Sequence, residues 1–245
     1  MSEFMKALRV ALSARKGFYE VCGIVDRHQR VYPLGSDTKV LSTIFELISR
    51  PVIIKLAEER GLQVIEPESQ NHYPDFTVLK NSNDKRKVAI DVKTTYRKPN
   101  GTFTYTLGGY TSFIREGNES KNIVFPFNQY AEHWVIGFVY DRIATKKSAD
   151  SHIFKVSEIR NIQLPFSNVE FFVQEKWRIS SDRAGSGNTT NIGSITAPLE
   201  DFKAGNGVFE SEDEFLAYWR GYERTDAERK TAYRTIGGFR ERNRS

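Results

Sequence analysis

The stretch PDFTVLKNSNDKRKVAIDVK, residues 74–93, decides the fold of this chain. Residues 75–80 and 87–93 are rich in apolar and β-branched side chains, whereas residues 81–85 are Asn, Ser, Asn, Asp and Lys. Strand-forming runs on either side of a short polar segment indicate a β-hairpin. We therefore expect two neighbouring strands here, with one face turned towards a core.

This hairpin is expected to bring two carboxylates together. Symmetry about Asn83 makes Phe76 face Ile90. The same register makes Asp75 face Asp91, on the side of the sheet opposite the apolar residues. Directly opposed residues have Cβ atoms roughly 4.5–5.5 Å apart, and like charges there repel. A divalent cation bound by both carboxylates would reverse that cost.

A lysine completes the group. Lys93 lies two residues after Asp91, so its side chain is on the same face as the two aspartates. Two carboxylates that hold Mg²⁺, with a lysine beside them, suit phosphodiester hydrolysis, because the cation polarises the phosphate while the lysine orients a water or offsets charge. The alternative to a catalytic group is a purely structural one, in which Asp75 caps a turn and Asp91 and Lys93 lie on a solvated strand face. A two-carboxylate glycosidase explains the group less well, since it gives the lysine no role.

The rest of the chain is predicted to be helical near its ends and stranded in the middle. Residues 2–16 have helical spacing, and a second helix begins at Ser36-Asp37 and runs to Gly61. We expect Pro51 to kink this helix or to end its first half. A third helix is indicated after Ser211. Strand-like runs occupy residues 62–66, 75–80, 87–95, 103–107, 133–140 and 169–180. This order predicts an α/β fold around one central sheet.

Charge and composition restrict the function less than the motif does. The 245 residues carry a net charge of +5, and the segment from Arg220 to Ser245 accounts for +4 of it, with eight basic and four acidic residues. A basic tail is typical of solvated chain ends as well as of nucleic-acid binding. The sequence contains no apolar run of about 18 residues and begins without a signal-peptide pattern, so we expect no membrane segment and a cytoplasmic protein.

Five segments of the chain resemble one enzyme family. Pro74-Asp75 with Asp91-Val92-Lys93 is similar to the P-D…D-x-K signature of the restriction-endonuclease-like nucleases. Four longer segments resemble type II restriction endonucleases in the same order: YPLGSDTKVLSTIFELISRP (32–51), QNHYPDFT (70–77), TLGGYTSFIR (106–115) and AGSGNTTNIGSI (184–195). The resemblance implies a restriction-endonuclease-like α/β fold, with a central mixed β-sheet flanked by helices.

The same resemblance implies an activity and a set of catalytic residues. It implies a Mg²⁺-dependent type II restriction endonuclease, a homodimer that binds double-stranded DNA at the palindrome GATATC and cuts its centre to leave blunt ends. It makes Asp75 and Asp91 the Mg²⁺ ligands and Lys93 the third catalytic residue. Glu46, on the polar side of the long helix, corresponds to a further carboxylate near the metal.

The resemblance also implies which residues contact DNA. Glycines let a backbone approach base edges, and Asn and Thr side chains offer donors, acceptors and a methyl group. The corresponding major-groove recognition loop is Gly185, Ser186, Gly187, Asn188, Thr189 and Thr190. A second loop, along the minor groove, is Ser69, Gln70 and Asn71. Contacts to the DNA backbone are expected from Lys39, Ser42, Thr95, Ser112, Lys121, Arg220 and Arg224.

We expect one domain, and two alternative functions stay open. Residues 1–245 form a single endonuclease domain, with a small dimerisation subdomain from about 19–32 and 150–160. A nuclease of the same fold with another target, such as a different palindrome or a DNA junction, stays open. A sequence-specific DNA-binding protein without catalysis also stays open, although the intact Asp75, Asp91 and Lys93 argue against it.

Overall fold

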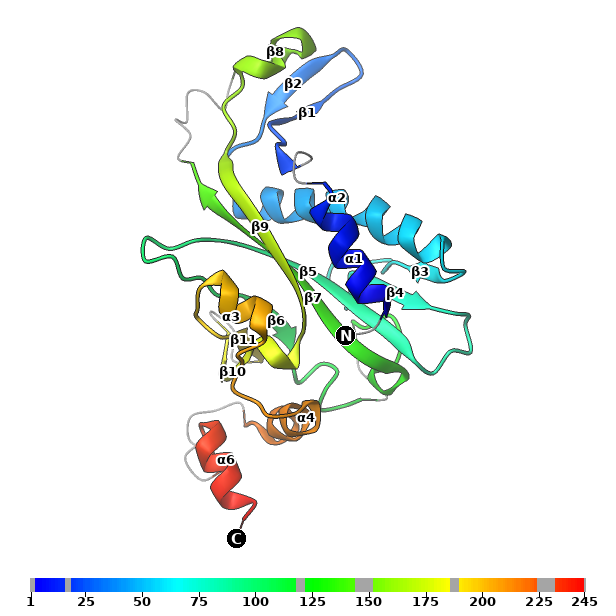
Figure 1. Ribbon diagram of the computed structural model, residues 1–245, viewed down its shortest axis with the longest axis vertical. Helices are drawn as coiled ribbons and strands as arrows, with labels where there is room; N and C mark the ends of the chain where they lie inside the picture. Colours follow the sequence, from blue (N-terminus) through cyan, green and yellow to red (C-terminus); the bar gives the residue numbers. More distant parts are fainter. Residues whose placement is uncertain are drawn as a thin grey trace.

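The computed structural model describes residues 3–15, 19–117, 122–143, 152–185, 190–223 and 232–244. A five-stranded sheet with the order β3-β4-β5-β7-β9 lies at the centre of the molecule (Figure 1). Its strands are β3 (Gln63–Ile65), β4 (Phe76–Leu79), β5 (Lys87–Tyr96), β7 (Tyr130–Arg142) and β9 (Phe166–Glu175). The β5–β7 pair is parallel and the other pairs are antiparallel. The expected α/β fold with a central mixed sheet is confirmed.

The β4–β5 hairpin has the predicted register. Phe76 pairs with Ile90 and Val78 with Val88, as symmetry about Asn83 requires. Asp75 directly precedes the first residue of β4. It therefore enters the sheet beside Asp91, the residue that follows Ile90 in β5.

Two helices cover one face of the sheet. α1 (Glu3–Ser13) and α2 (Thr38–Glu58) pack on Phe76, Ile90 and other apolar side chains of that face. The helix start predicted at residues 36–37 is confirmed, because the Asp37 carboxylate accepts a hydrogen bond of 2.8 Å from the Lys39 amide. The helix does not end at Pro51. Residues buried on both sides of this proline hold the two halves against the same core.

Among the described residues, the other face carries a second small sheet and several helices. The sheet has the order β10-β11-β6, formed by β6 (Thr106–Gly109), β10 (Ser180–Ala184) and β11 (Asn191–Ser194). The helices are α3 (Leu199–Ala204), α4 (Glu212–Gly221) and α6 (Ile236–Arg242). The start of α4 was predicted, and its Ser211 hydroxyl accepts from the Glu214 amide at 3.1 Å. Within the described residues, no helix combines the length and apolarity needed to cross a membrane.

A third sheet projects from one end of the molecule, at the top of Figure 1. β1 (Gly23–Val25) and β2 (Arg30–Pro33) form a hairpin, and β8 (Phe154–Lys155) pairs with β2. A short 3-10 helix, η3 (Val156–Asn161), follows β8. The structure therefore brings together β1, β2, β8 and η3, which make up most of the two segments expected to form a dimerisation subdomain. Tyr19 instead packs in the main core against Phe45 and Phe138, and residues 150 and 151 lie outside the described part of the chain.

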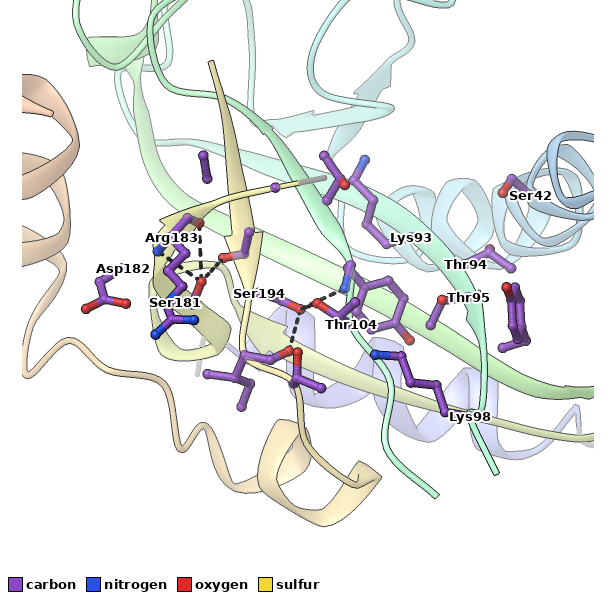
Figure 2. A pocket seen from close by; sticks show the side chains of 18 of the residues that line it. Ser42, Lys93, Thr94, Thr95, Lys98, Thr104, Ser181, Asp182, Arg183 and Ser194 are labelled. Carbon is purple, nitrogen blue, oxygen red and sulfur yellow. Dashed lines mark hydrogen bonds between the residues drawn. The ribbon is translucent and has the colours of Figure 1, made fainter. Parts of the chain in front are cut away.

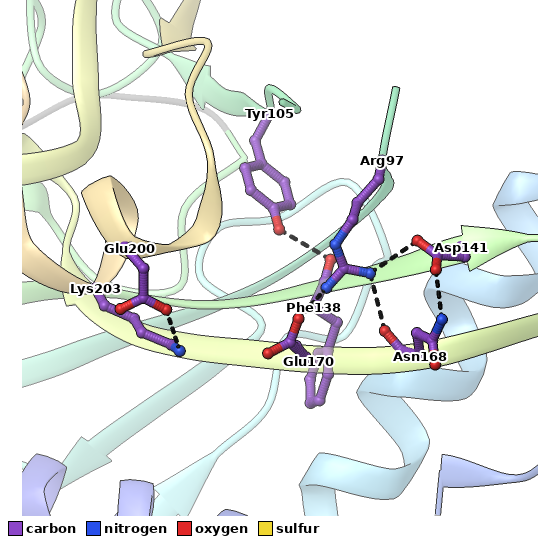
Figure 3. Close-up of polar contacts among 8 residues, drawn as sticks. All are labelled: Arg97, Tyr105, Phe138, Asp141, Asn168, Glu170, Glu200 and Lys203. Atoms are coloured by element: carbon purple, nitrogen blue, oxygen red, sulfur yellow. Dashed lines mark hydrogen bonds and ion pairs between the residues drawn. The ribbon is translucent and has the colours of Figure 1, made fainter. Parts of the chain in front are cut away.

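A polar cluster ties together the ends of three central strands (Figure 3). Arg97, which follows β5, donates to Asp141 Oδ1 of β7 at 3.0 Å and to the Asn168 carbonyl of β9 at 2.9 Å. Its guanidinium also pairs with Glu170. The cluster fixes β5, β7 and β9 relative to one another, and β5 carries the predicted catalytic residues.

Candidate active site

The predicted carboxylate pair lies at the junction of β4 and β5. The Asp75 carboxylate accepts a hydrogen bond of 2.6 Å from the Val92 amide, which holds it alongside Asp91. Asp91 is buried, with 3% of its surface exposed. Its Oδ2 lies 2.5 Å from Lys93 Nζ, an ion pair, and makes no regular hydrogen bond within the described part of the chain.

The electrostatics of this group follow from burial and from the two like charges. Burial raises the pKa of Asp75, and repulsion by Asp91 raises it further, against the opposing effects of Lys93 and the Val92 amide. Burial lowers the pKa of Lys93, but attraction by Asp91 and Asp75 outweighs it, so the net shift is upward. The site therefore favours a positive charge next to the carboxylates.

These residues fit a divalent cation. Carboxylate oxygens are the ligands that Mg²⁺ prefers, and the buried Oδ2 of Asp91 is already paired with a cation, the Lys93 ammonium, which a divalent ion would displace or join. Asp75 and Asp91 are the residues that would hold the ion. Lys93 remains beside them as a fixed cation.

The structure does not join Glu46 to this pair. Glu46 lies exposed on α2, within electrostatic range of Lys93 and Asp91. Desolvation raises the pKa of its carboxyl, with Lys93 opposing and Asp91 adding to the shift. No group of three His, Cys, Asp or Glu side chains among the described residues is arranged to hold one metal ion.

A cavity of about 320 Å³ opens onto the carboxylate pair. Besides Asp75, Asp91 and Lys93, its walls include several residues expected to contact DNA: Gln70, Asn71, Ser112 and Thr190. Segments far apart in the sequence thus meet around the catalytic group.

A larger cavity of about 960 Å³ adjoins the first, because Lys93 lines both (Figure 2). Three more of the expected DNA contacts line it: Ser42, Thr95 and Gly185. Lys98 and Arg183 add positive charge to the same walls. We did not predict these two residues. The basic pair Arg97-Lys98 directly after a strand was an available signal for Lys98, whereas β10, which carries Arg183, had no clear strand pattern.

The remaining expected residues lie elsewhere. Lys39 and Ser69 are exposed and line neither cavity. Arg220 lies on α4, where its Nε donates to the Ile114 carbonyl at 3.3 Å and its side chain borders a different cavity. The two cavities lined by Lys93 together form a cleft. The structure does not bring Arg220 to this cleft. Outside the described residues are Ser186, Gly187, Asn188, Thr189, Lys121 and Arg224.

Comparisons with known proteins agree on one family. The sequence model of the family described as restriction endonuclease EcoRV matches residues 15–243. The type II restriction enzyme EcoRV of Escherichia coli is 57% identical over 223 residues, which cover 91% of this chain and 90% of that protein. Among solved structures, the NlaIV restriction endonuclease matches with a TM-score of 0.36 and 14% identity, over 87% of this chain and 78% of that one. A likeness at that TM-score supports no inference.

Proposed function

Because the chain belongs to the EcoRV family of type II restriction endonucleases, it is a site-specific deoxyribonuclease, and we propose that it cuts double-stranded DNA at GATATC with Mg²⁺. The observation that carries this proposal is the pair formed by the half-buried Asp75 and the buried Asp91, with Lys93 beside them on the wall of the cleft. Because the proposed substrate is DNA, we also propose that the protein is located in the cytoplasm.

Each catalytic residue has a physical role in this proposal. Asp75 and Asp91 hold the divalent cation, which when bound polarises the scissile phosphate and acidifies water. Lys93 orients the attacking water and offsets the negative charge that develops on the phosphate. The water oxygen bonds to phosphorus as the bond to the 3′ oxygen breaks, and that oxygen takes up a proton. The products are 5′-phosphate and 3′-hydroxyl ends.

Specificity is proposed to come from two loops and from the DNA itself. Residues 185–190 read base edges in the major groove, with Asn188 and Thr189 as the principal readers, and Gln70 and Asn71 follow the minor groove. The central TA step of GATATC kinks easily, so bending energy adds discrimination at base pairs that the protein does not touch.

The test of this function is a digestion of DNA of known sequence with Mg²⁺, followed by sequencing of the ends. We expect blunt cuts at the centre of GATATC, and no cuts when a chelator replaces the metal. Staggered ends or cuts at another palindrome would instead support a same-fold nuclease with a different target. Binding without cutting would support a DNA-binding protein that lacks catalysis.

We also propose that the enzyme is a homodimer through the β1-β2-β8 sheet, since each subunit of a two-fold dimer then meets one half of the palindrome. An exposed apolar surface supports this proposal. Its members on this sheet, on η3 and on the adjoining segment are Ile24, Val25, Tyr32, Ile153, Val156 and Ile159. Ile24 and Tyr32 pair directly across β1 and β2, so their side chains share one face of this sheet, and an exposed apolar patch of this kind is typical of an interaction surface.

A charge in this patch should separate the subunits. Ile24 is 57% exposed, so Ile24→Lys costs little in the monomer, but in the dimer it buries an unpaired ammonium. We expect analytical ultracentrifugation to show a monomer for Ile24→Lys and a dimer for the parent protein. Val10→Lys, at a residue that is 67% exposed on α1, is the matched control and should remain dimeric. A dimeric Ile24→Lys protein would contradict the proposed interface.

A further inference from the structure

Asp182 joins the proposed recognition strand to the C-terminal helices. It lies in β10, three residues before Gly185. Its main-chain carbonyl accepts a hydrogen bond of 2.7 Å from the Tyr218 hydroxyl of α4. Its Oδ2 accepts a hydrogen bond of 3.0 Å from the amide of Ile236, the first residue of α6. Two helices thus hold one residue of this strand.

These helices are themselves fixed to each other. Arg240 of α6 donates from Nε to Glu214 Oε1 of α4 at 2.6 Å, and from Nη2 to Glu214 Oε2 at 2.9 Å. The Phe239 ring of α6 packs edge-on against Tyr218, with 5.6 Å between the ring centroids. A two-point ion pair and an aromatic contact define where the Ile236 amide lies.

The strand needs this support because its own ladder is irregular. β10 pairs with β11 at Ser180 and at Ala184, and the register shifts between these two positions, where Asp182 lies. At the base of the loop, the Gly185 amide donates to the Asn191 carbonyl at 2.7 Å. The described ends of the loop are therefore held by hydrogen bonds to the small sheet, which include one of 3.0 Å from the Tyr110 amide to the Thr190 carbonyl, and by the Asp182 contacts to the helices.

We propose that Asp182 is a positioning residue for specificity, through which α4 and α6 set the place of the recognition loop in the major groove. The proposal rests on the function proposed for residues 185–190. Base readout depends on side chains placed to within a fraction of an ångström, and each mismatch is rejected through a few hydrogen bonds. Releasing Asp182 loosens the loop, so that GATATC and sites with one altered base pair become more alike as substrates.

Ile236→Pro removes the contact selectively. Proline lacks the amide that Asp182 accepts, and it is well tolerated at the first position of a helix. Thr235, at φ −135° and ψ 160°, already has the extended backbone that proline requires of its predecessor. Ile236→Val keeps the amide and a β-branched side chain, so it is the matched control. Tyr218→Phe removes the second contact to Asp182 and, with the same hydroxyl, the longer contact of 3.3 Å to the Arg234 carbonyl, while Ile236 keeps its amide.

The measurement is the ratio of kcat/KM at GATATC to kcat/KM at each one-base-pair variant of that site. For Ile236→Pro we expect this ratio to fall about tenfold, the effect of one hydrogen bond to a charged group, while the rate at GATATC stays close to that of Ile236→Val. Tyr218→Phe should shift the ratio in the same direction, which keeps the test valid if the proline variant fails to fold.

Two outcomes would overturn the proposal. One is an unchanged ratio in whichever of the two variants folds. The other is an equal fall in rate at every site, because this would mean that the contact only stabilises the fold. If the parent protein does not cut GATATC, the proposed target is wrong, and the same ratios are measured at the sequence that it does cut. The two failures are thereby distinguished.

Discussion

Asp91→Ala is expected to abolish DNA cleavage while leaving the fold and DNA binding intact. Asp91 supplies half of the carboxylate pair, and its buried Oδ2 is the oxygen best placed to meet a cation. A metal ion contributes several kcal/mol to such a reaction, and about 1.4 kcal/mol is tenfold in rate, so kcat should fall by at least roughly a thousandfold. Without metal, the melting temperature should change little, because relief of the repulsion between Asp75 and Asp91 opposes the loss of the Asp91–Lys93 ion pair, and Asp75 remains as a counter-charge for Lys93.

Single-turnover cleavage with excess enzyme measures the chemical step of this variant, and a gel shift in Ca²⁺ measures its binding. Asp141→Asn is the control. Asp141 is also a carboxylate of the central sheet paired with a cation, Arg97, at 3.0 Å, but it lies outside both cavities of the cleft (Figure 3). Asparagine keeps a side-chain oxygen that can accept from Arg97, so the cluster should stay in place and this variant should cut at the parent rate. A normal rate for Asp91→Ala would refute the catalytic assignment.

Of the substitutions proposed for this protein, Gly137→Ala is expected to lower the free energy of unfolding the most. Gly137 lies in β7, paired with Lys93 of β5, and an added Cβ would be 2.2 Å from Cε1 and Cζ of Phe172. The Phe172 ring is buried and packs against Tyr105 and Phe202, with centroids 5.8 and 5.1 Å away, so it cannot turn aside. Overpacking of this kind costs about 1–3 kcal/mol.

Thermal unfolding checks this loss. About 1 kcal/mol lowers the melting temperature of a domain of this size by roughly 2–4 °C, so a shift of several degrees is expected. Gly117→Ala is the matched control, since a methyl group there meets no atom of the described residues within 4 Å. It should melt with the parent protein. If Gly137→Ala melted there too, Phe172 would have more freedom than its packing indicates.

The sequence predicted those parts of the fold that local patterns determine. The β4–β5 register follows from a short turn and an alternating pattern, so Phe76 and Ile90 could be paired without a structure. β10, β11 and α6 were not predicted. β11 pairs with β6 at Asn191 and Gly109, more than eighty residues apart, and nothing in the short run around Asn191 indicates a strand by itself.

The candidate site also has one part that local sequence patterns predict and another that depends on long-range strand pairing. Asp75, Asp91 and Lys93 could be grouped because two adjacent strands carry them. The opposite wall of the cleft depends on long-range pairing, so Arg183 could not be found. Charge counting was also a poor guide to the C-terminal segment. Arg240, one of its basic residues, is paired with Glu210 and Glu214 and so contributes little to the attraction of DNA.

The hydrogen bond from the Val92 amide to the Asp75 carboxylate determines which sequence changes the active site can tolerate. That amide belongs to the peptide unit that joins Asp91 to Val92, so the spacing of the two carboxylates is set by covalent bonds and one hydrogen bond. The turn at residues 81–85 lies at the far end of the hairpin and acts on this spacing only through the β4–β5 register. Changes in the turn that keep this register should therefore leave the two carboxylates in place, whereas inserting one residue between Asp91 and Lys93 would turn the lysine to the other face of the sheet.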